Sequence, residues 1–220
     1  MATKVIMAWS GGKDSALSLY YILKNKEYEV VSLLTTVSEE YGRITMHGVR
    51  EKLLDKQAQS IGIPVKRVYI SKSDGFDGYN NKMEYTMKAF FKGDVKGVVF
   101  GDIFLEDVKK YREENLSKVG MYGIFPLWGK NTKEIAKEFI SLGFKAILAC
   151  VDGTKLDESF VGREYNGDFV SSFPDNLDVC GENGEFHSFV YDGPIFKHPI
   201  EFEKGEKTFR DNRFYYIDLK

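Results

Sequence analysis

The chain has 220 residues, with 31 Lys and Arg against 33 Asp and Glu and a formal net charge of −2. Apolar residues make up 43% and charged residues 29%, a globular composition, and a chain of this length buries roughly 70–75% of its unfolded surface. The nearly balanced charge argues against a protein held to nucleic acid or to a membrane by bulk electrostatics. Two cysteines exclude a disulfide framework and fit a reducing compartment. The apolar run at residues 5–9 is too short for a signal peptide or a membrane span, so we expect a cytoplasmic globular protein.

Over the first two-thirds of the chain, short β-rich runs alternate with stretches of helical period. Residues 5–9, Val-Ile-Met-Ala-Trp, are a continuous apolar run, typical of a strand buried on both faces of a parallel sheet. The strands are predicted at residues 5–9, 30–36, 65–70, 98–100 and 124–128, and the helices at residues 14–25, 47–61, 78–91 and 106–118. Strands separated by helices of this length predict an α/β fold, a Rossmann-like parallel sheet with helices on both faces.

The pattern changes after about residue 128. Ile135, Phe139 and Leu142 share one helix face, residues 146–151 indicate another buried strand, and a polar stretch follows. The tail is rich in β-branched and aromatic residues, and it is interrupted by an Asp-Gly-Pro turn and an Asp-Asn turn, which predict two hairpins. These turns lie at residues 192–194 and 211–212. We therefore divide the chain into a nucleotide-binding type of domain at residues 1–128 and a smaller C-terminal α+β domain at residues 129–220, with a cleft between them.

The strongest chemical signal is Ser-Gly-Gly-Lys-Asp-Ser at residues 10–15, between the first strand and the first helix. The two glycines let the backbone turn sharply and bring its N–H groups against a ligand. The helix N-terminus adds unpaired N–H groups and the positive end of the helix dipole. Ser10 and Ser15 add hydroxyl donors, and Lys13 adds a full charge. This combination predicts an anion site suited to a pyrophosphate.

A Gly-Gly turn ahead of a surface helix is the ordinary alternative, because tight turns often use glycine. The position of the loop favours a ligand site, since it follows the carboxyl end of the first strand, where open α/β sheets bind their ligands. Its spacing is neither that of the Walker loop, which has four residues between Gly and Gly-Lys, nor that of G-x-G-x-x-G.

The loop resembles the PP-loop of the ATP pyrophosphatases, enzymes that cleave ATP between the α and β phosphates. Members activate a carboxylate or carbonyl oxygen as its adenylate, and a nitrogen or sulfur nucleophile then displaces AMP. The resemblance implies an adenine nucleotide alpha hydrolase-like fold, ATP and Mg²⁺ as cofactors, and Asp14 as a ligand of the metal. The residues that it implies around the leaving pyrophosphate are Ser10, Gly11, Gly12, Lys13, Asp14 and Ser15. Such a loop stabilises the charge that develops on the leaving group.

Further landmarks extend the resemblance over nearly the whole chain. They are His47-Gly48-Val49, Gly101-Asp102-Ile103, Arg112-Glu113-Glu114-Asn115, Pro126-Leu127-Trp128, Gly162-Arg163 and, at residues 180–187, Cys-Gly-Glu-Asn-Gly-Glu-Phe-His. In this order they resemble the diphthine–ammonia ligase family and its uncharacterised relatives. That family uses ATP and ammonium to amidate the carboxylate of a modified histidine on translation elongation factor 2, the last step of diphthamide biosynthesis. Relatives often carry Gly where this chain has Asn183, a residue that tolerates the left-handed conformation of such a turn.

The acidic turn near residue 183 is the second candidate for chemistry. Glu182 and Glu185 lie three residues apart and could orient ammonium, take its proton or bind Mg²⁺, whereas the ordinary alternative is a solvated acidic turn. His187 is a further candidate for the ammonium proton, although such a histidine is more often structural. The candidate catalytic residues are Lys13, Asp14, Glu182 and Glu185.

The remaining landmarks are candidates for binding. Gly101 and Asp102 follow the fourth strand, at the sheet edge where ligands collect, and are assigned to the nucleotide. Arg112 could hold a substrate carboxylate in a bidentate pair or belong to a polar helix face, and Trp128 could be core or cleft lining. The candidate substrate-binding residues are His47, Arg112, Glu114, Asn115, Trp128, Gly181, Asn183 and His187.

The leading hypothesis is therefore an AMP-forming carboxylate–ammonia ligase that acts on diphthine, or on another carboxylate if the source is bacterial. Free ammonium is the expected nitrogen source, since Ala2 follows Met1 and no N-terminal cysteine is present as a glutaminase nucleophile. A tRNA-thiolating PP-loop enzyme is the alternative, although Cys150 and Cys180 are isolated and no basic groove for tRNA is indicated. The third hypothesis is a regulatory module that binds a nucleotide but does not turn it over. Elongation factor 2 is the expected protein partner, a homodimer is allowed, and neither membrane nor nucleic acid is expected.

Overall fold

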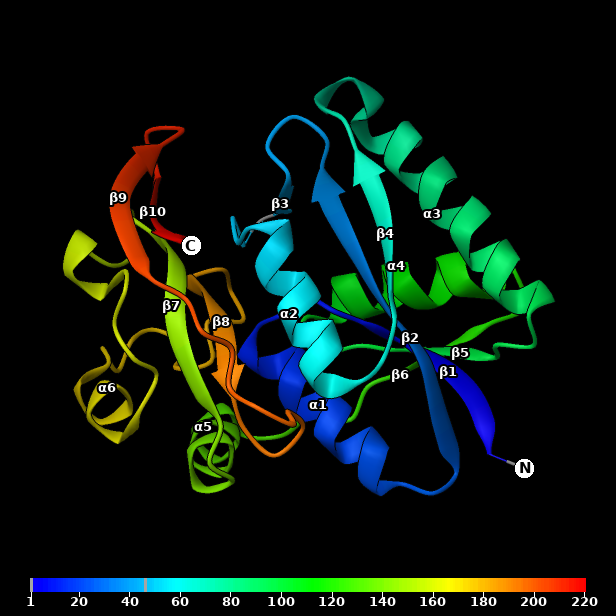
Figure 1. Cartoon of the computed structure of the whole chain (residues 1–220), viewed down its shortest axis with the longest axis horizontal. Helices are drawn as coiled ribbons and strands as arrows, with labels where there is room; N and C mark the ends of the chain where they lie inside the picture. The colour runs from blue at the N-terminus through cyan, green and yellow to red at the C-terminus, as the bar shows by residue number, and fades with distance from the viewer. Residues whose placement is uncertain (1, 46) are drawn as a thin grey trace.

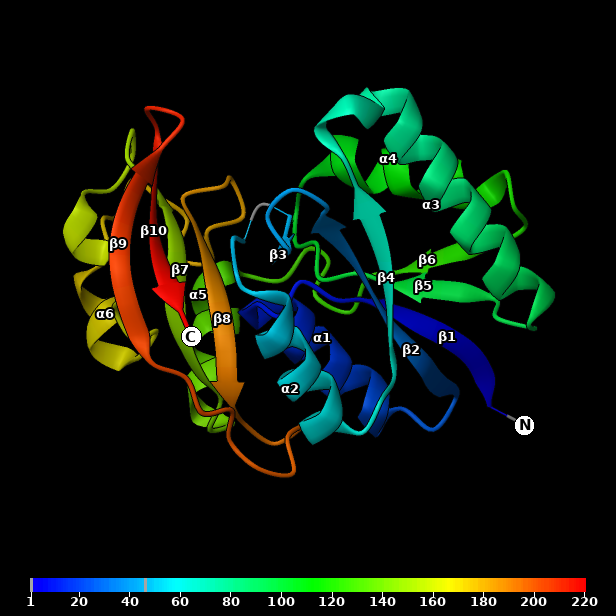
Figure 2. The ribbon, with the colours of Figure 1, turned by 45° about the horizontal axis from the view of Figure 1, so that its top comes forward.

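The computed structural model describes residues 2–45 and 47–220, which form two β-sheets with helices around them (Figure 1, Figure 2). The elements in chain order are β1 (Thr3–Ala8), α1 (Lys13–Lys24), β2 (Tyr28–Ser38), β3 (Arg43–Ile44), α2 (Glu51–Ile61), β4 (Val65–Ile70), the 3₁₀ helix η1 (Lys72–Asp74), α3 (Gly75–Lys92), β5 (Gly97–Val99), α4 (Glu106–Ser117), β6 (Tyr122–Ile124), α5 (Thr132–Ser141), β7 (Lys145–Asp152), the 3₁₀ helix η2 (Glu158–Phe160), α6 (Gly167–Ser172), β8 (Phe186–Asp192), β9 (Lys204–Arg210) and β10 (Phe214–Leu219). None of the helices in the described residues is both long and apolar enough to cross a membrane.

The larger sheet confirms the predicted Rossmann-like arrangement. β1 pairs in parallel with β2 and β5, β2 pairs in parallel with β4, and β5 with β6, while the two-residue β3 runs antiparallel beside the end of β2. Successive side chains of a strand point to opposite faces, so Val5 and Met7 pack under α1 and α2, whereas Ile6 packs under α3 and α4. Both faces of β1 are therefore buried, which is why its sequence is apolar without alternation.

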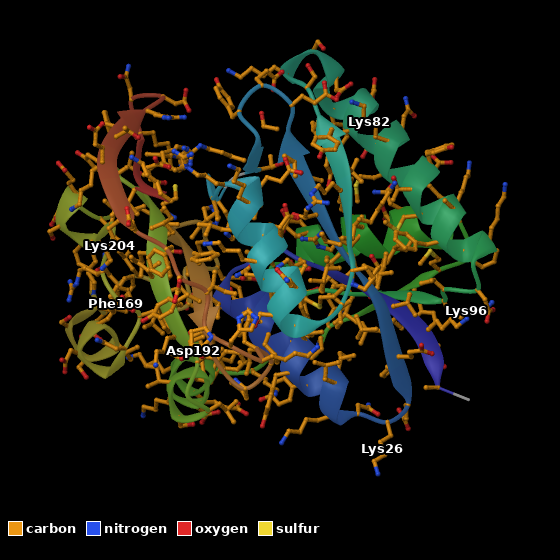
Figure 3. The ribbon with its side chains drawn as sticks, viewed as in Figure 1. Lys26, Lys82, Lys96, Phe169, Asp192 and Lys204 are labelled. Atoms are coloured by element: carbon orange, nitrogen blue, oxygen red, sulfur yellow. The ribbon has the colours of Figure 1, made fainter. Side chains whose placement is uncertain are left out.

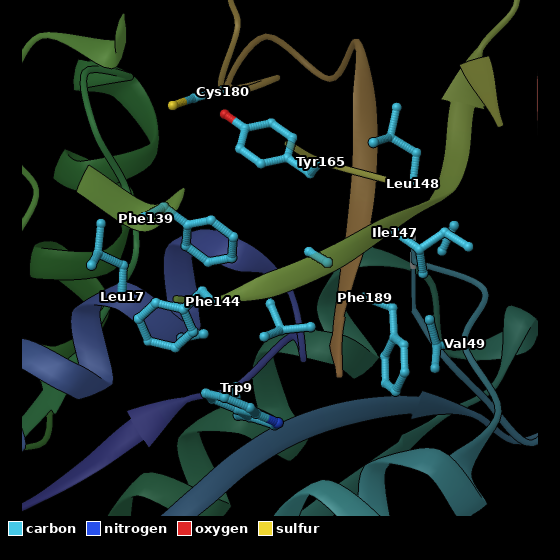
Figure 4. Close-up of a cluster of buried hydrophobic side chains, with 14 of the residues drawn as sticks. Trp9, Leu17, Val49, Phe139, Phe144, Ile147, Leu148, Tyr165, Cys180 and Phe189 are labelled. Carbon is cyan, nitrogen blue, oxygen red and sulfur yellow. The ribbon is translucent and has the colours of Figure 1, made fainter. Parts of the chain in front are cut away.

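The smaller sheet has four antiparallel strands in the order β8-β7-β10-β9, with α5 and α6 packed beside it. One apolar core runs from α1 and α2 of the first half into this sheet. Figure 4 shows Leu17 of the first half beside Phe139 and Phe144 of the second, and Val49 of the first half beside Phe189 of the second. The two halves therefore share buried surface, and β8 lies directly against α1.

Two predicted elements are shorter than their sequence patterns indicate. The helix predicted from residue 47 begins at Glu51, because Gly48 is left-handed with φ 69° and the chain folds back so that the Ile44 N–H donates to the Val49 carbonyl at 2.8 Å. The extended run predicted at residues 124–128 ends with β6 at Ile124. A turn follows, closed by the Trp128 N–H on the Phe125 carbonyl at 3.2 Å.

Of the two predicted hairpins, one is confirmed and one is wrong. At residues 211–212 the chain turns between β9 and β10 with Asp211 and Asn212 both left-handed, at φ 54° and 49°, as a type I′ turn requires. The Asp-Gly-Pro turn at residues 192–194 does not form a hairpin, because β8 pairs with β7 while β9 pairs with β10 on the far side of the sheet. Residues 193–203 instead cross from one edge strand to the other.

A charged cluster joins the last strand to the first half of the chain. The Asp218 carboxylate on β10 accepts hydrogen bonds from Arg43 at 2.8 Å and from Arg50 at 2.9 and 2.6 Å. The hydrogen bonds from Arg50 and Arg43 outweigh burial and hold the pKa of Asp218 far below its usual range. The cluster fixes the strand against the segment that precedes α2.

We expect Asp218→Asn to lower the free energy of unfolding by about 1–2 kcal/mol at pH 7, since hydrogen bonds to charged groups are lost but solvent screens the half-exposed Arg50. A carboxyl group whose pKa is lowered by folding stabilises the protein above its unfolded pKa of about 3.9, and the contribution is lost as pH falls. Urea unfolding should therefore show a difference between wild type and variant that is present at pH 7 and shrinks below about pH 4.

The matched control is Asp94→Asn, which removes an ion pair with Lys96 from a carboxylate that is 70% exposed. Its effect should stay within about 0.5 kcal/mol at both pH values. An Asp218→Asn protein as stable as the control at pH 7 contradicts the assigned role of the cluster.

Candidate functional site

The loop at residues 10–15 connects β1 to α1 and brings several hydrogen-bonding groups to the border of a cavity. Gly11 is left-handed at φ 76°, and Gly12 stands at the helix N-cap with no side-chain cap on the first turn. The Gly12 N–H donates to the Ser10 hydroxyl at 3.2 Å, and the Ser10 and Ser15 hydroxyls are 3.1 Å apart. Backbone N–H groups, two hydroxyls and a helix N-terminus thus converge, the arrangement that binds phosphate.

This loop borders a cavity of about 510 Å³, which lies at the carboxyl ends of β1, β2 and β5. Its other walls are α3, α4 and the segment that leads from Cys180 into β8. The structure thus brings together residues more than 170 positions apart in the sequence. The predicted site residues that line the cavity are Ser10, Gly12, Lys13, Asp14, Ser15, His47, Gly101, Asp102, Arg112, Asn115, Gly181, Glu182 and His187.

Three of the residues predicted to bind substrate do not line this cavity. Glu114 is 61% exposed on α4, where it faces Lys110. Trp128 packs against Phe125, and Lys109 Nζ lies 4.4 Å from the centroid of its indole ring. Asn183 points its amide to Glu185, at 3.3 Å. Their placement does not fit substrate binding at this cavity, because a helix and a turn each present only some of their side chains to one side.

The two glutamates of the acidic turn separate into different environments. Glu185 is 2% exposed and does not line the cavity, and its Oε1 accepts hydrogen bonds from the Asp178 N–H at 3.4 Å and from Asn183 at 3.3 Å. It braces the turn, so the catalytic role predicted for it does not fit. Glu182 lines the cavity, and its Oε1 accepts the Ile103 N–H at 2.7 Å.

The Glu182 carboxyl is suited to proton transfer at neutral pH. Burial raises its pKa to about 7, and the negative charge of Asp14 adds to this shift, while the Ile103 N–H and Lys13 oppose it. A carboxyl group with a pKa near the working pH exchanges its proton readily, as a general base requires.

Lys13 borders the cavity, and its ammonium group is paired within the protein. Its side chain is 3% exposed, and Nζ donates to both oxygens of Asp14 at 2.8 and 2.7 Å and to the Cys180 carbonyl. The ammonium group also lies 5.8 and 5.5 Å from the ring centroids of Tyr165 and Phe186, the first of which Figure 4 shows beside Cys180. Burial alone lowers the pKa of Lys13, but Asp14 together with Cys180 and Asp178 outweighs it, so the net shift is upward. Lys13 is therefore a paired cation that fastens the loop to the second half of the chain.

A pair of histidines lies beside the loop. The His47 and His187 rings are 4.5 Å apart, and the Cε1 of His47 is 3.1 Å from where a Cβ on Gly12 would stand. Burial lowers the pKa of both rings, with the positive charge of Lys13 adding to it, and that of His187 falls to about 4. Both are neutral at pH 7. The His47 Nδ1 is 3.4 Å from the Ser188 carbonyl, an acceptor, so Nδ1 carries the proton and Nε2 keeps its lone pair.

Arg112 is already bound to another predicted site residue. Its Nε is 2.7 Å from the Asp102 carboxylate, and its guanidinium lies 4.4 Å from the ring centroid of Phe100. A substrate carboxylate at Arg112 therefore has to compete with Asp102, which weakens the predicted bidentate role.

One wall of the cavity is apolar, a feature that was not predicted from the sequence. Leu34 of β2, Val98 of β5 and Met87 of α3 form part of this wall. Tyr79, Met83 and Met87 recur every four residues along α3 and line the same wall, a stripe that could have been identified from the sequence. This wall gives the cavity an apolar end opposite its polar loop.

Comparisons with known proteins give one consistent family. Residues 3–122 match the family model of the diphthamide synthase N-terminal domain, and residues 131–220 match that of the diphthamide synthase C-terminal domain. The chain is 25% identical to the diphthine–ammonia ligase of Mus musculus over 224 residues and 26% identical to that of Homo sapiens over 223 residues. In each case the match covers 90% of this chain and 82% of the relative. The diphthine–ammonia ligase of Saccharomyces cerevisiae is 24% identical, with 34% of its length matched.

A solved structure, titled as a predicted subunit of a tRNA methyltransferase from Methanocaldococcus jannaschii, superposes with a TM-score of 0.43 at 18% identity. The superposition covers 65% of this chain and 77% of that one. A likeness this partial bears on neither the fold nor the function of the chain.

We expect the Glu182 carboxyl to titrate at about pH 7 rather than near 4.3, the value of an unperturbed glutamate, because the cavity wall desolvates it. Carbon-detected NMR of labelled glutamate side chains measures this directly. The resonance that moves between pH 6 and 8 should be absent from Glu182→Gln and present in Glu185→Gln. A Glu182 resonance that titrates near its unperturbed value contradicts the environment described for it.

Proposed function

Since the chain belongs to the diphthamide synthase family and is a ligase, we propose that it adenylates a carboxylate with ATP and amidates it with ammonia. The proposed carboxylate is that of diphthine on translation elongation factor 2, in keeping with the names of its relatives, or another carboxylate if the source is bacterial. One observation carries the proposal: the loop at residues 10–15 and the Glu182 carboxyl border the same cavity.

The two ends of the cavity suit the two ends of ATP. In this proposal the triphosphate lies against the loop, where N–H groups and hydroxyls face the cavity, and the adenine lies against the apolar wall around Met87. A volume of about 510 Å³ is within the range of small-molecule sites. The acyl group then enters beside Glu182, between the two halves of the chain.

The proposed reaction has two steps. A carboxylate oxygen of the acceptor attacks the α-phosphorus, an acyl–O–P bond forms, and pyrophosphate leaves with the electron pair of the broken P–O bond. The loop stabilises the charge on this leaving group. Ammonia then attacks the acyl carbon, a C–N bond forms, AMP leaves with the electron pair of the C–O bond, and the nitrogen loses a proton. Holding the reactants side by side contributes several kcal/mol, on the order of 7 or more in favourable cases.

We assign the proton of the attacking nitrogen to Glu182. With a pKa of about 7 its carboxylate is a stronger base than the His187 ring, whose pKa is about 4. The neutral imidazoles can accept an N–H hydrogen bond from ammonia without taking its proton. This division of roles supports a nitrogen nucleophile that arrives on the side of β8.

Mg²⁺ fits the residues that border the phosphate end. Asp14 and Asp102 have carboxylate oxygens there, which are paired with Lys13 and Arg112 and would have to exchange a partner for the metal. No group of three His, Cys, Asp or Glu in residues 2–45 and 47–220 is already arranged around a metal. Mg²⁺ is usually held by one or two carboxylates together with phosphate oxygens, so Asp14 is the proposed ligand. The metal would neutralise charge on the phosphates.

tRNA thiolation is the weaker proposal, since it needs a reactive thiol. Cys150 and Cys180 are both buried, and burial raises the pKa of each thiol to about 12. Charge is also dispersed: in Figure 3, Lys26 and Lys96 point outward from separate parts of the chain, and Lys204 on β9 donates to the Gly162 carbonyl. A cytoplasmic location, a homodimer and the absence of nucleic-acid binding stay predictions.

The proposal predicts AMP and pyrophosphate, in equal amounts, from a mixture of the protein with ATP, ammonium and elongation factor 2 that carries diphthine. Product analysis by chromatography should show AMP only when both the acceptor and ammonium are present. ADP as the product, or AMP formed without the acceptor, contradicts it.

Gly12→Ala tests whether the loop is where ATP binds. The new Cβ would stand 3.1 Å from both His47 and the Ser188 carbonyl, so the loop must move, and we expect the KM for ATP to rise at least about ten-fold, or 1.4 kcal/mol. The control is Gly167→Ala, where a Cβ meets nothing within 4 Å. Equal KM values for the two variants exclude the loop as the ATP site.

The assignment of Glu182 predicts a pH dependence of kcat/KM. A general base acts when deprotonated, so the rate should rise with pH around an apparent pKa of about 7. Glu182→Gln should be about 10²–10⁴-fold slower, and its kcat/KM should no longer rise with pH around 7. Glu185 does not line the cavity, so Glu185→Gln should keep this rising limb of the pH profile. An unchanged limb in Glu182→Gln rules out this base.

A further inference from the structure

A buried glutamine beneath the loop makes three hydrogen bonds that no predicted role explains. Gln57 lies on α2 with no exposed surface. Its Oε1 accepts the Trp9 Nε1–H at 3.0 Å, and its Nε2 donates to the Gly11 carbonyl at 3.1 Å and to the Val190 carbonyl at 2.7 Å. One side chain therefore holds the end of β1, the loop and β8.

We propose that Gln57 is a positioning residue that orients the Gly11–Gly12 peptide for phosphate binding. In a trans peptide the carbonyl and the following N–H point in opposite directions. By holding the Gly11 carbonyl toward α2 and β8, Gln57 turns the Gly12 N–H toward the cavity, where it now donates to the Ser10 hydroxyl.

The same carbonyl also accepts a backbone bond from the second half of the chain. The Val190 N–H donates to the Gly11 carbonyl at 2.9 Å, so both lone pairs of this oxygen are engaged. The loop thus has its working orientation only while β8 is seated against α2. Gln57 donates to two carbonyls, those of Gly11 and Val190, and accepts from Trp9, a combination that an uncharged amide supplies and that neither a carboxylate nor an ammonium group can.

The close packing of Gln57 against the loop explains why residue 11 is a glycine. A Cβ on Gly11 would stand 2.7 Å from the Gln57 Oε1, and the left-handed φ of 76° further disfavours any side chain there. The first glycine of the loop is therefore required by the glutamine beneath it as well as by the turn.

The inference rests on the proposed function in one respect, that the loop binds the phosphates of ATP. Gln57→Met keeps the length of the side chain and removes its hydrogen bonds. We expect it to weaken the binding of MgATP at least ten-fold in calorimetry and to speed hydrogen exchange of the Val190 N–H in the ligand-free protein.

The matched control is Ser60→Ala. Ser60 is also fully buried on α2 and ties the helix to the second half of the chain, since its hydroxyl donates to the His198 carbonyl at 2.6 Å and accepts the His198 N–H at 3.1 Å. It touches no part of the loop. Its MgATP affinity should stay within two-fold of wild type, and the exchange of the Val190 N–H should be unchanged. A purely structural role of Gln57 predicts that the two variants behave alike.

If Gln57→Met does not fold, Trp9→Phe removes the bond to Oε1 together with part of a buried ring, and it should weaken MgATP binding by a smaller factor, about two- to five-fold. The inference is overturned if wild type and Gln57→Met bind MgATP equally. If wild type itself fails to bind MgATP, the proposed function is what fails, and faster exchange at Val190 in Gln57→Met, but not in Ser60→Ala, still supports the positioning role.

Discussion

The structure depends on how the loop after β1 is held against the second half of the chain. The Gly11 carbonyl accepts from Val190 and Gln57, the Lys13 N–H donates to the Ser188 hydroxyl at 3.1 Å, and Lys13 Nζ donates to the Cys180 carbonyl. These bonds are buried, where an unpaired backbone group costs about 1–3 kcal/mol. The loop and the small sheet therefore stabilise each other, and neither half has its site alone.

This contact between the loop and the second half of the chain determines the pairing and the protonation state of each ionisable group near the cavity. The Lys13 ammonium is paired with Asp14 and with the Cys180 carbonyl. The Ser10 and Ser15 hydroxyls, 3.1 Å apart, lie beside it at the border of the cavity. The same burial keeps His47 and His187 neutral and raises the pKa of Glu182. Desolvation thus gives Glu182 a pKa near neutral pH, while the groups around it each keep one protonation state at that pH.

Much of the fold could be predicted because its signals are local. An apolar run without alternation marks a strand buried on both faces, and Asp211-Asn212 marks a hairpin because few residues adopt two left-handed positions in sequence. The Asp-Gly-Pro turn at residues 192–194 failed as a hairpin because β9 pairs with β10, and β10 lies beside β7 on the side away from β8. Likewise tryptophan is a residue type that often lines clefts, but the Lys109 side chain covers the Trp128 ring.

The sequence by itself determined the parallel sheet, the position of the loop at its carboxyl edge and the glycines that loop needs, since each follows from backbone sterics and short-range periodicity. Only the tertiary structure decided that Glu182 faces the cavity while Glu185 does not, that Lys13 is paired, and that Gln57 lies under Gly11. The physical reason is that neighbours up to 175 residues away, such as Ser188 beside Lys13, determine how deeply a side chain is buried. Burial in turn determines its protonation state and which of its hydrogen-bonding groups have partners.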